Sequence, residues 1–306
     1  MPRKYCAGQA GTPHAMLAGM TFRRDVELDP GQVRDVRGRR VTGGGVAIGG
    51  GLGGIVLLIV FVLLGGNPGD LGLAPGGAGT GPVSSELATE CRTGADANER
   101  QDCRLVGAVN SLDEYWSGAF AASGNQYQQP ITTLFADGVD TACGGATSAV
   151  GPFYCPLDQT IYIDLGFYQQ LETQFGAEGG PFAEMYVIAH EYGHHVQNLL
   201  GLLEQGRDAG AEGGAVRTEL QADCFAGVWG GNAVDTGFLE PLTPEQIAQA
   251  LDAAETIGDD RIQEQTEGQV NPETWTHGSS EQRQEWFTIG LEQKAADACD
   301  TFNADV

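Results

Sequence analysis

The sequence contains little positive charge. Its 306 residues include 16 Lys and Arg against 41 Asp and Glu, giving a net charge of −25. Eight of the basic residues but only four of the acidic ones lie within residues 1–66, so the remainder carries eight basic and thirty-seven acidic residues. Such a chain repels phosphate backbones, and we predict no nucleic-acid partner. The acidity is consistent with simple solubility and with a preference for cationic peptides.

Several common motifs are also missing. No C-x-x-C pair occurs, which disfavours a zinc ribbon, and no G-x-S-x-G elbow or internal repeat is present. Six cysteines follow residue 66, and six cysteines allow fifteen pairings. The sequence cannot choose among them. The simplest pairing has two local bridges and one that closes a long loop: Cys91–Cys103, Cys143–Cys155 and Cys224–Cys299.

One long apolar run is present, "VAIGGGLGGIVLLIVFVLL", at residues 46–64. About 20 apolar residues span a bilayer, so we predict one transmembrane helix. The alternative is a cleaved signal peptide, but the run is too long for one and no A-x-A pattern follows closely. Four arginines precede the run, which places the N-terminus in the cytoplasm: Arg34, Arg37, Arg39 and Arg40.

The predicted organisation is therefore a single-pass protein of the cell membrane with an extracytoplasmic catalytic domain. It has a cytoplasmic segment (1–42), an anchor (43–66), a Gly/Pro-rich tether (67–84) and a folded domain (85–306). The cysteine content is also consistent with export, because disulfides form in oxidising compartments outside the cytoplasm. Because "MTFRRDVELD" from Met20 reads like a natural start, we expect that residues 1–19 are not translated, which the intact mass would test.

The spacing of apolar residues and the residues typical of helix ends predict a mainly helical α+β domain with a small β-sheet. Apolar residues at helical spacing predict a helix over about 98–121, and the alternating "TIYID" predicts a strand at 160–164. A helix should begin at Pro181 and end at Gly201, and another should cover about 215–230. Capping boxes predict that two later helices begin after Thr243 and Ser279.

The stretch "HEYGHHVQ" holds three of the five histidines. His190 and His194 are four apart, so on a helix they lie one turn apart on the same face, with Glu191 beside them. This is the H-E-x-x-H pattern, in which two histidines bind zinc and the glutamate is the general base. His195 lies about 100° around the helix from His194, so we predict a packing residue rather than a ligand. Gly193 inside a helix is less stable than alanine would be. We therefore predict either that a close-packed neighbour, such as a strand, requires it or that the fold simply tolerates this loss.

Twenty-five residues on, "ELQAD" places Glu219 and Asp223 at helical spacing. A catalytic zinc needs three protein ligands and an open position, and Glu219 is the predicted third ligand. Asp223, one turn later, is predicted to accept a hydrogen bond from a zinc-bound histidine. The alternative for both is a solvated acidic helix face.

Three blocks of this chain, "HEYGHHVQNLLG", "ELQADCFAGVW" and "THGSSEQRQEWF", resemble the signature blocks of the bacterial "putative neutral zinc metallopeptidase" family. The resemblance runs from about residue 84 to the C-terminus and includes "GPFYCPLDQTIYIDLGF". It implies a zincin-like, gluzincin-type metalloprotease domain with a substrate-binding edge strand. It also implies Zn²⁺ ligation by His190, His194 and Glu219, with Glu191 as base. It does not supply a natural substrate.

The block around His277 more distantly resembles the "THPS…R" stretch of CAAX-processing and heat-shock membrane metalloproteases. Gly278 replaces the proline, while Arg283 keeps its six-residue offset. His277 is a catalytic candidate that would donate a hydrogen bond to the developing oxyanion. The alternative is a loop histidine that caps a helix or contacts Asp223, and Tyr162 or Tyr192 would then be the donor.

The sequence thus predicts a membrane-anchored zinc metalloendopeptidase that hydrolyses peptide bonds with a zinc-activated water and Glu191 as base. We expect the strand at 160–164 to align an extended polypeptide substrate. Two alternatives remain: a zinc-stabilised binding or scaffold ectodomain without catalysis, and a zinc amidase acting on cell-wall peptides. Cleavage preference and oligomeric state do not follow from the sequence.

Overall fold

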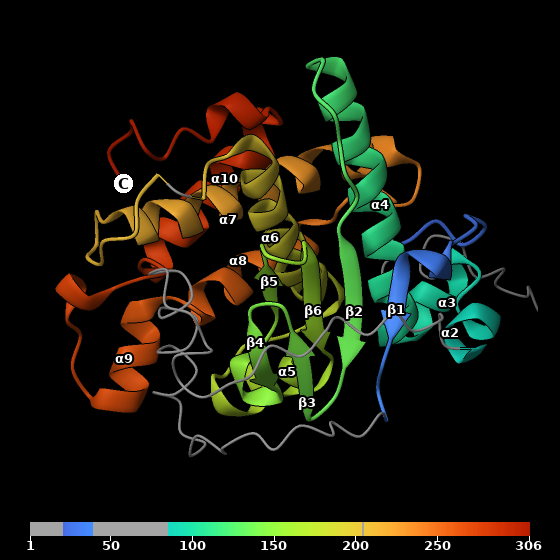
Figure 1. The fold of residues 1–306 in the computed structure, drawn as a ribbon, viewed down its shortest axis with the longest axis horizontal. Helices are drawn as coiled ribbons and strands as arrows, with labels where there is room; N and C mark the ends of the chain where they lie inside the picture. The colour runs from blue at the N-terminus through green and yellow to red at the C-terminus, as the bar shows by residue number, and fades with distance from the viewer. Residues whose placement is uncertain (1–20, 39–84, 204) are drawn as a thin grey trace, which may run out of the picture.

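The computed structural model describes residues 21–38, 85–203 and 205–306. These residues form the mainly helical α+β fold with a small sheet that the sequence predicts (Figure 1). The helices are α2 (Ser85–Glu90), α3 (Gly94–Glu99), α4 (Gln101–Ala122), α5 (Gly166–Gln174), α6 (Pro181–Leu200), α7 (Gly214–Asn232), α8 (Pro244–Thr256), α9 (Asp259–Glu267) and α10 (Ser280–Gln293).

The main sheet has four strands in the order β1 (Val33–Asp35), β2 (Ile131–Phe135), β6 (Thr160–Asp164) and β5 (Phe153–Cys155). The first three are parallel, and β5 pairs antiparallel with β6. A separate hairpin joins β3 (Gly138–Thr141) to β4 (Gly144–Thr147). The strand predicted at 160–164 is confirmed as β6. Its main chain already pairs with β2 and β5, so the prediction that it aligns a substrate strand is wrong. The edge strands of this sheet are β1 and β5.

Local signals set the helix ends as predicted. Pro181 is the first residue of α6, and Gly201 ends the helix in a left-handed conformation with φ of 71°. Thr243 and Ser279 each form a complete capping box at the start of α8 and α10. The predicted helix at 215–230 is α7, and that at 98–121 divides into α3 and α4 at Arg100.

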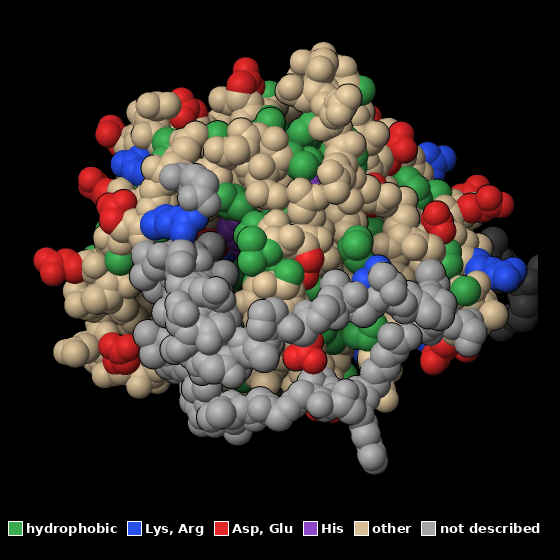
Figure 2. Space-filling model, viewed as in Figure 1, with side chains coloured by type: hydrophobic (Ala, Val, Ile, Leu, Met, Phe, Trp, Pro, Cys, Tyr) green, Lys and Arg blue, Asp and Glu red, His purple; other side chains and the backbone are tan. Residues whose placement is uncertain are grey.

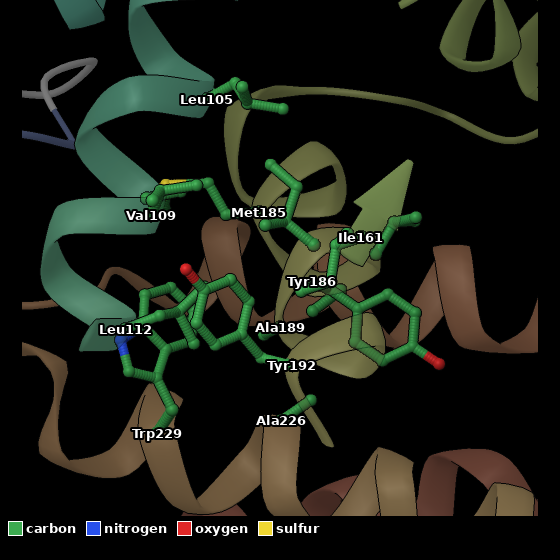
Figure 3. Close-up of a cluster of buried hydrophobic side chains, with 14 of the residues drawn as sticks. Leu105, Val109, Leu112, Ile161, Met185, Tyr186, Ala189, Tyr192, Ala226 and Trp229 are labelled. Atoms are coloured by element: carbon green, nitrogen blue, oxygen red, sulfur yellow. The ribbon is translucent and has the colours of Figure 1, made fainter. Parts of the chain in front are cut away.

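The core forms where α4 and α7 pack on α6. Leu105, Val109 and Leu112 share one face of α4 and point toward Met185 and Tyr192 of α6 (Figure 3). Trp229 of α7 belongs to the same cluster, and all these side chains are buried (Figure 3). Helix α6 is therefore enclosed by apolar contacts over most of its length, which makes it a rigid support for polar side chains.

The described residues contain three disulfides, Cys91–Cys103, Cys143–Cys155 and Cys224–Cys299. They are the two local bridges and the long-loop bridge that the simplest pairing predicts. The third links α7 to the segment after α10, and the second links the β3–β4 hairpin to edge strand β5.

The N-terminal segment 21–38 packs into the same fold as residues 85–306. Strand β1 pairs with β2, and Phe22 is fully buried, with its backbone held by the Asn98 side chain at 2.8 and 2.9 Å. A chain that crosses a membrane once between these parts would place them on opposite sides. The predicted localisation, with a cytoplasmic N-terminus and an extracytoplasmic domain, is therefore wrong.

The predicted transmembrane helix at 43–66 and tether at 67–84 lie outside the described residues. Within the part of the chain that the structure describes, no helix is both long enough and apolar enough to cross a bilayer.

Candidate metal centre

Helix α6 carries several polar side chains in the interior of the domain, and three of them border one cavity. His190, Glu191 and His194 are each at most 8% exposed. The two imidazole rings lie with their centroids 4.8 Å apart and their planes nearly perpendicular. Both histidines therefore occupy one face of α6, as their spacing predicts.

Glu219 of α7 completes the cluster. Its Oε2 lies 3.1 Å from His190 Nε2, and its Oε1 lies 3.5 Å from His194 Nε2. One donor atom from each of the three residues lies within 4.8 Å of the other two. The structure thus brings together the three residues that the sequence predicts as ligands, although they come from two helices. Glu219 is 2% exposed, so it is not part of a solvated acidic face.

A glycine lets the two helices approach. A Cβ atom placed on Gly193 would lie 2.8 Å from both the Cα and the carbonyl oxygen of Ala222 in α7. The predicted close-packed neighbour is therefore real, but it is a helix rather than a strand. Ala222 lies one turn from Glu219, so the contact at Gly193 brings the Glu219 carboxylate within reach of the histidines.

The rings of both histidines are held by bonds at Nδ1. Asp223 Oδ1 accepts a bond of 2.7 Å from His190, and Gln197 Oε1 accepts one of 2.9 Å from His194. A histidine that donates from Nδ1 keeps the lone pair of Nε2 available, and in both residues Nε2 is the atom that faces Glu219. Gln197 in turn donates to the Thr218 carbonyl at 2.7 Å, which anchors it to α7.

Asp223 is fully buried and has two further partners. Arg283 of α10 donates to it from Nε at 2.9 Å and from Nη2 at 3.0 Å, and the Tyr186 hydroxyl donates at 2.5 Å. Helix α10 reaches this depth because its backbone packs on that of α7 at Gly227 and Gly290. The predicted hydrogen bond between Asp223 and a histidine is present in the structure.

The surrounding carboxylates stabilise positive charge at this point. Burial opposes a charged His190, but the charge and hydrogen bond of Asp223, together with Glu219, raise its pKa to about 10. Burial likewise opposes ionisation of Glu219, yet His194 and His190 hold the pKa of Glu219 well below its ordinary value. The carboxylates of Asp223 and Glu219 therefore favour positive charge at this place in the domain.

Glu191 is in a different position from Glu219. Burial raises its pKa above the ordinary value for a glutamate, partly offset by the two histidines. It lines a cavity of about 310 Å³ together with the three clustered residues. Figure 2 shows a histidine side chain in a hollow bordered by hydrophobic side chains.

His277 lines the same cavity from the loop before α10. Its Nδ1 lies 3.2 Å from Asp259 Oδ1, and Asp259 also accepts the backbone N–H groups of Thr276 and His277 at 2.6 Å. Burial opposes its protonation, but Asp259 and Glu219 raise the pKa of His277 above its ordinary value. Its carboxylate partner is thus Asp259, and not Asp223, the contact considered in the alternative interpretation of His277.

The other candidates lie away from the cavity. Tyr162 donates to Asp158 at 2.9 Å, and Tyr192 is buried in the core cluster; neither lines the cavity. His195 is fully buried between the Tyr154 hydroxyl at 3.0 Å and the Gln128 carbonyl at 2.6 Å. Burial lowers the pKa of His195 to about 4, so it is a neutral packing residue, as predicted.

Sequence reasoning missed three residues of this site: Tyr186, Gln197 and Arg283. Tyr186 is four residues before His190, and Gln197 is three after His194, so helical spacing from the histidines would have identified both as candidates. The sequence distinguishes Arg283 only by its six-residue offset from His277. No spacing rule connects it to Asp223, sixty residues away, since α10 brings the two together.

Comparison with known proteins gives a consistent result. The sequence profile of the family described as "Putative neutral zinc metallopeptidase" matches residues 20–302. The uncharacterized protein Rv2575 of Mycobacterium tuberculosis is 55% identical over 225 residues, covering 71% of this chain and 75% of the relative. The uncharacterized protein YpfJ of Escherichia coli K12 is 40% identical over 288 residues, covering 89% and 96%. No solved structure is significantly similar to the chain.

Proposed function

Because the chain belongs to the "Putative neutral zinc metallopeptidase" family, we propose that it is a zinc metalloendopeptidase with a zincin-like catalytic domain. The observation that carries the proposal is the meeting of two imidazoles and one carboxylate from α6 and α7, with Glu191 beside them on the cavity wall. His190, His194 and Glu219 are the proposed ligands.

The donor set suits zinc. Two histidine nitrogens and one carboxylate are a ligand combination of catalytic zinc, which keeps a further position for water or substrate. Both histidines have Nδ1 occupied by an acceptor, so Nε2 is available as the donor atom. When bound, zinc would acidify a water molecule and polarise the scissile carbonyl.

Glu191 is the proposed general base. It takes the proton of the attacking water at a carboxylate oxygen and then donates it to the leaving nitrogen. Burial, which raises its pKa, makes its carboxylate a stronger base than an exposed glutamate. Its enclosure in the domain also keeps bulk water from competing for the proton.

His277 is the proposed oxyanion donor. Asp259 holds its Nδ1 and, with Glu219, favours the protonated ring, whose Nε2–H is then available for donation. A donor held in place before the reaction stabilises developing charge without a reorganisation cost. Asp259 positions the ring and also binds the backbone of its loop.

The cavity supports an endopeptidase rather than an exopeptidase. Its α6 wall runs from Val187 to Asn198, roughly 16 Å at the helical rise, with the clustered residues between these ends. An extended chain of about five residues covers that length. Edge strand β5 contributes Phe153 and Tyr154 to the wall, so we propose that it pairs with the substrate main chain.

The test uses the full chain, loaded with zinc, and the Glu191→Gln variant. We expect one zinc per chain in both proteins and cleavage of an unfolded polypeptide by the wild type alone. A scaffold protein with structural zinc would hold the metal and cleave nothing in either form. Cleavage that persists in Glu191→Gln would refute the assignment of the base.

A further inference from the structure

The cavity is apolar at one end. Helix α5 contacts the first turn of α6, where the Tyr168 hydroxyl donates to the Glu184 carbonyl at 3.3 Å. Helix α9 meets the end of α5, where Gln265 donates to the Phe175 carbonyl at 3.4 Å. Six apolar side chains from α5, α6 and the α8–α9 region line this end, here termed the apolar compartment: Phe167, Leu171, Phe175, Val187, Ile257 and Ile262.

This compartment adjoins the proposed metal centre directly. Val187 is one turn before His190 and Glu191 on α6, so it lies on the same face. The Ile257 carbonyl accepts a bond from Arg283 at 3.3 Å, and Arg283 also binds Asp223. A substrate residue next to the scissile bond could therefore place its side chain in the compartment.

The opposite end of the cavity also contains polar groups. Asn198 and Tyr154 line it, with Asn198 donating to the Tyr154 hydroxyl at 2.9 Å, and the apolar Leu203, which follows the end of α6, also lines the cavity. By contrast, none of the six side chains of the apolar compartment carries a charge or a polar group, and the polar residue that α5 adds to the cavity wall, Gln170, is uncharged. A charged side chain placed there would lose its hydration without meeting an opposite charge among these residues.

We propose that the apolar compartment binds a large aliphatic or aromatic side chain of the peptide substrate, on one side only of the scissile bond. The proposal rests on the proposed function. Phe167, Phe175, Ile257 and Ile262 are only half-buried, so they present apolar surface to the cavity that a substrate side chain would cover. Covering such surface is favourable, whereas an acidic or basic side chain is rejected.

The first test measures cleavage of blocked peptides by the zinc-loaded full chain. The peptides differ at one position, on either side of the scissile bond, in carrying Leu, Phe, Ala, Asp or Lys. We expect kcat/KM for Leu or Phe to exceed that for Asp by at least about ten-fold at one of the two positions. Equal rates at both positions would overturn the proposal and leave the proposed function intact.

The second test changes the compartment itself. Ile262→Asp should lower kcat/KM for the Leu peptide by about ten-fold or more and improve the relative rate for the Lys peptide. Val270→Asp is the matched control, because Val270 is 45% exposed and does not line the cavity. Zinc content and circular dichroism should match the wild type in both variants. The smaller change Ile262→Ala, which enlarges the compartment, should shift the optimum from Leu toward Phe.

A binding measurement separates the two proposals. Zinc-loaded Glu191→Gln protein is titrated with the Leu and Asp peptides by calorimetry. We expect at least about ten-fold tighter binding of the Leu peptide, lost in Glu191→Gln/Ile262→Asp. If the wild type cleaves nothing but binds the Leu peptide more tightly, the proposed role of the compartment is supported and the proposed peptidase function is refuted. Equal affinities would refute the compartment whatever the cleavage result.

Discussion

Gly193 of α6 lies against the backbone of Ala222 of α7, and this contact sets how closely Glu219 approaches the two histidines. The helices could not pack at this distance if either bore a larger side chain at the contact. The cluster of two imidazoles and one carboxylate therefore depends on a residue that contributes no ligand atom.

Gly193→Ala tests this dependence. Alanine improves helix propensity by about 1 kcal/mol, but here its methyl group would have to displace α7, and overpacking costs about 1–3 kcal/mol. We expect a lower melting temperature and at least about ten-fold weaker zinc binding, measured by calorimetric titration.

Gly118→Ala is the matched control. Gly118 lies within α4, is exposed and has open space around it, so alanine there should stabilise the protein by up to about 1 kcal/mol without changing zinc affinity. If Gly193→Ala behaves like this control, the close contact does not shape the site.

The bond between Asp223 and Arg283 predicts two separable effects. Asp223→Asn removes the charge that pairs with a buried guanidinium, and breaking a buried pair typically costs about 3–5 kcal/mol. It also weakens the acceptor for His190, and such a loss lowers zinc affinity by about 10- to 100-fold. Urea unfolding and zinc titration measure the two effects.

Asp223→Leu/Arg283→Met separates them. Replacing both partners by apolar residues removes the unpaired charge, so much of the stability should return, whereas zinc binding should remain weak because His190 still lacks its acceptor. Recovery of full zinc affinity in this double variant would show that Asp223 does not position the histidine.

His277→Gln tests the oxyanion donor. Removing one such donor typically lowers kcat by about 10²- to 10³-fold, and we expect a fall of this size with little change in KM. Zinc stoichiometry should be unchanged, because His277 is not in the ligand cluster. Loss of zinc, or a fall in kcat/KM caused by KM alone, would contradict the assignment.

Asp113 gives a pH dependence of stability that does not involve the metal centre. It accepts bonds from Tyr127 at 2.7 Å and from Gln129, and burial raises its pKa to about 6 despite these bonds. Between about pH 4 and pH 6 the folded chain therefore holds a proton that the unfolded chain has lost. Stability from this group is present at about pH 4 and falls as the pH rises through 6, by up to about 3 kcal/mol.

Asp113→Asn should remove this fall, because Asn stays neutral and the Gln129 amide can turn to offer its oxygen. The measurement is urea unfolding of both proteins from pH 4 to 7, compared as a difference. A difference that is constant across this range would mean that Asp113 does not titrate there in the folded protein.

The helical parts of the site follow from local sequence. Four-residue spacing puts His190 and His194, and likewise Glu219 and Asp223, on single helix faces, since the helical period is set by backbone hydrogen bonds within the element. The ends of α6 are equally local, because Pro181 and Gly201 act through their own backbone preferences.

The interior position of β6 could not be predicted in this way. Its sequence indicates a strand, but its neighbours β2 and β5 come from other parts of the chain and are decided by tertiary pairing. The prediction that β6 aligns the substrate is therefore wrong. The segment 21–38 is a similar case. A count of arginines near an apolar run predicts topology only if the two flanking parts are independent, and β1 joins the sheet of the main domain.

The sequence by itself thus determined which residues share a helix face, where the main helices end and which chemistry the H-E-x-x-H and E-x-x-x-D patterns suit. Only the tertiary structure decided that α6 and α7 meet at Gly193, that Arg283 reaches Asp223, and that β5 borders the cavity. The physical reason is range: helix faces and caps depend on neighbours within about four residues, whereas these contacts depend on the packing of whole elements against one another.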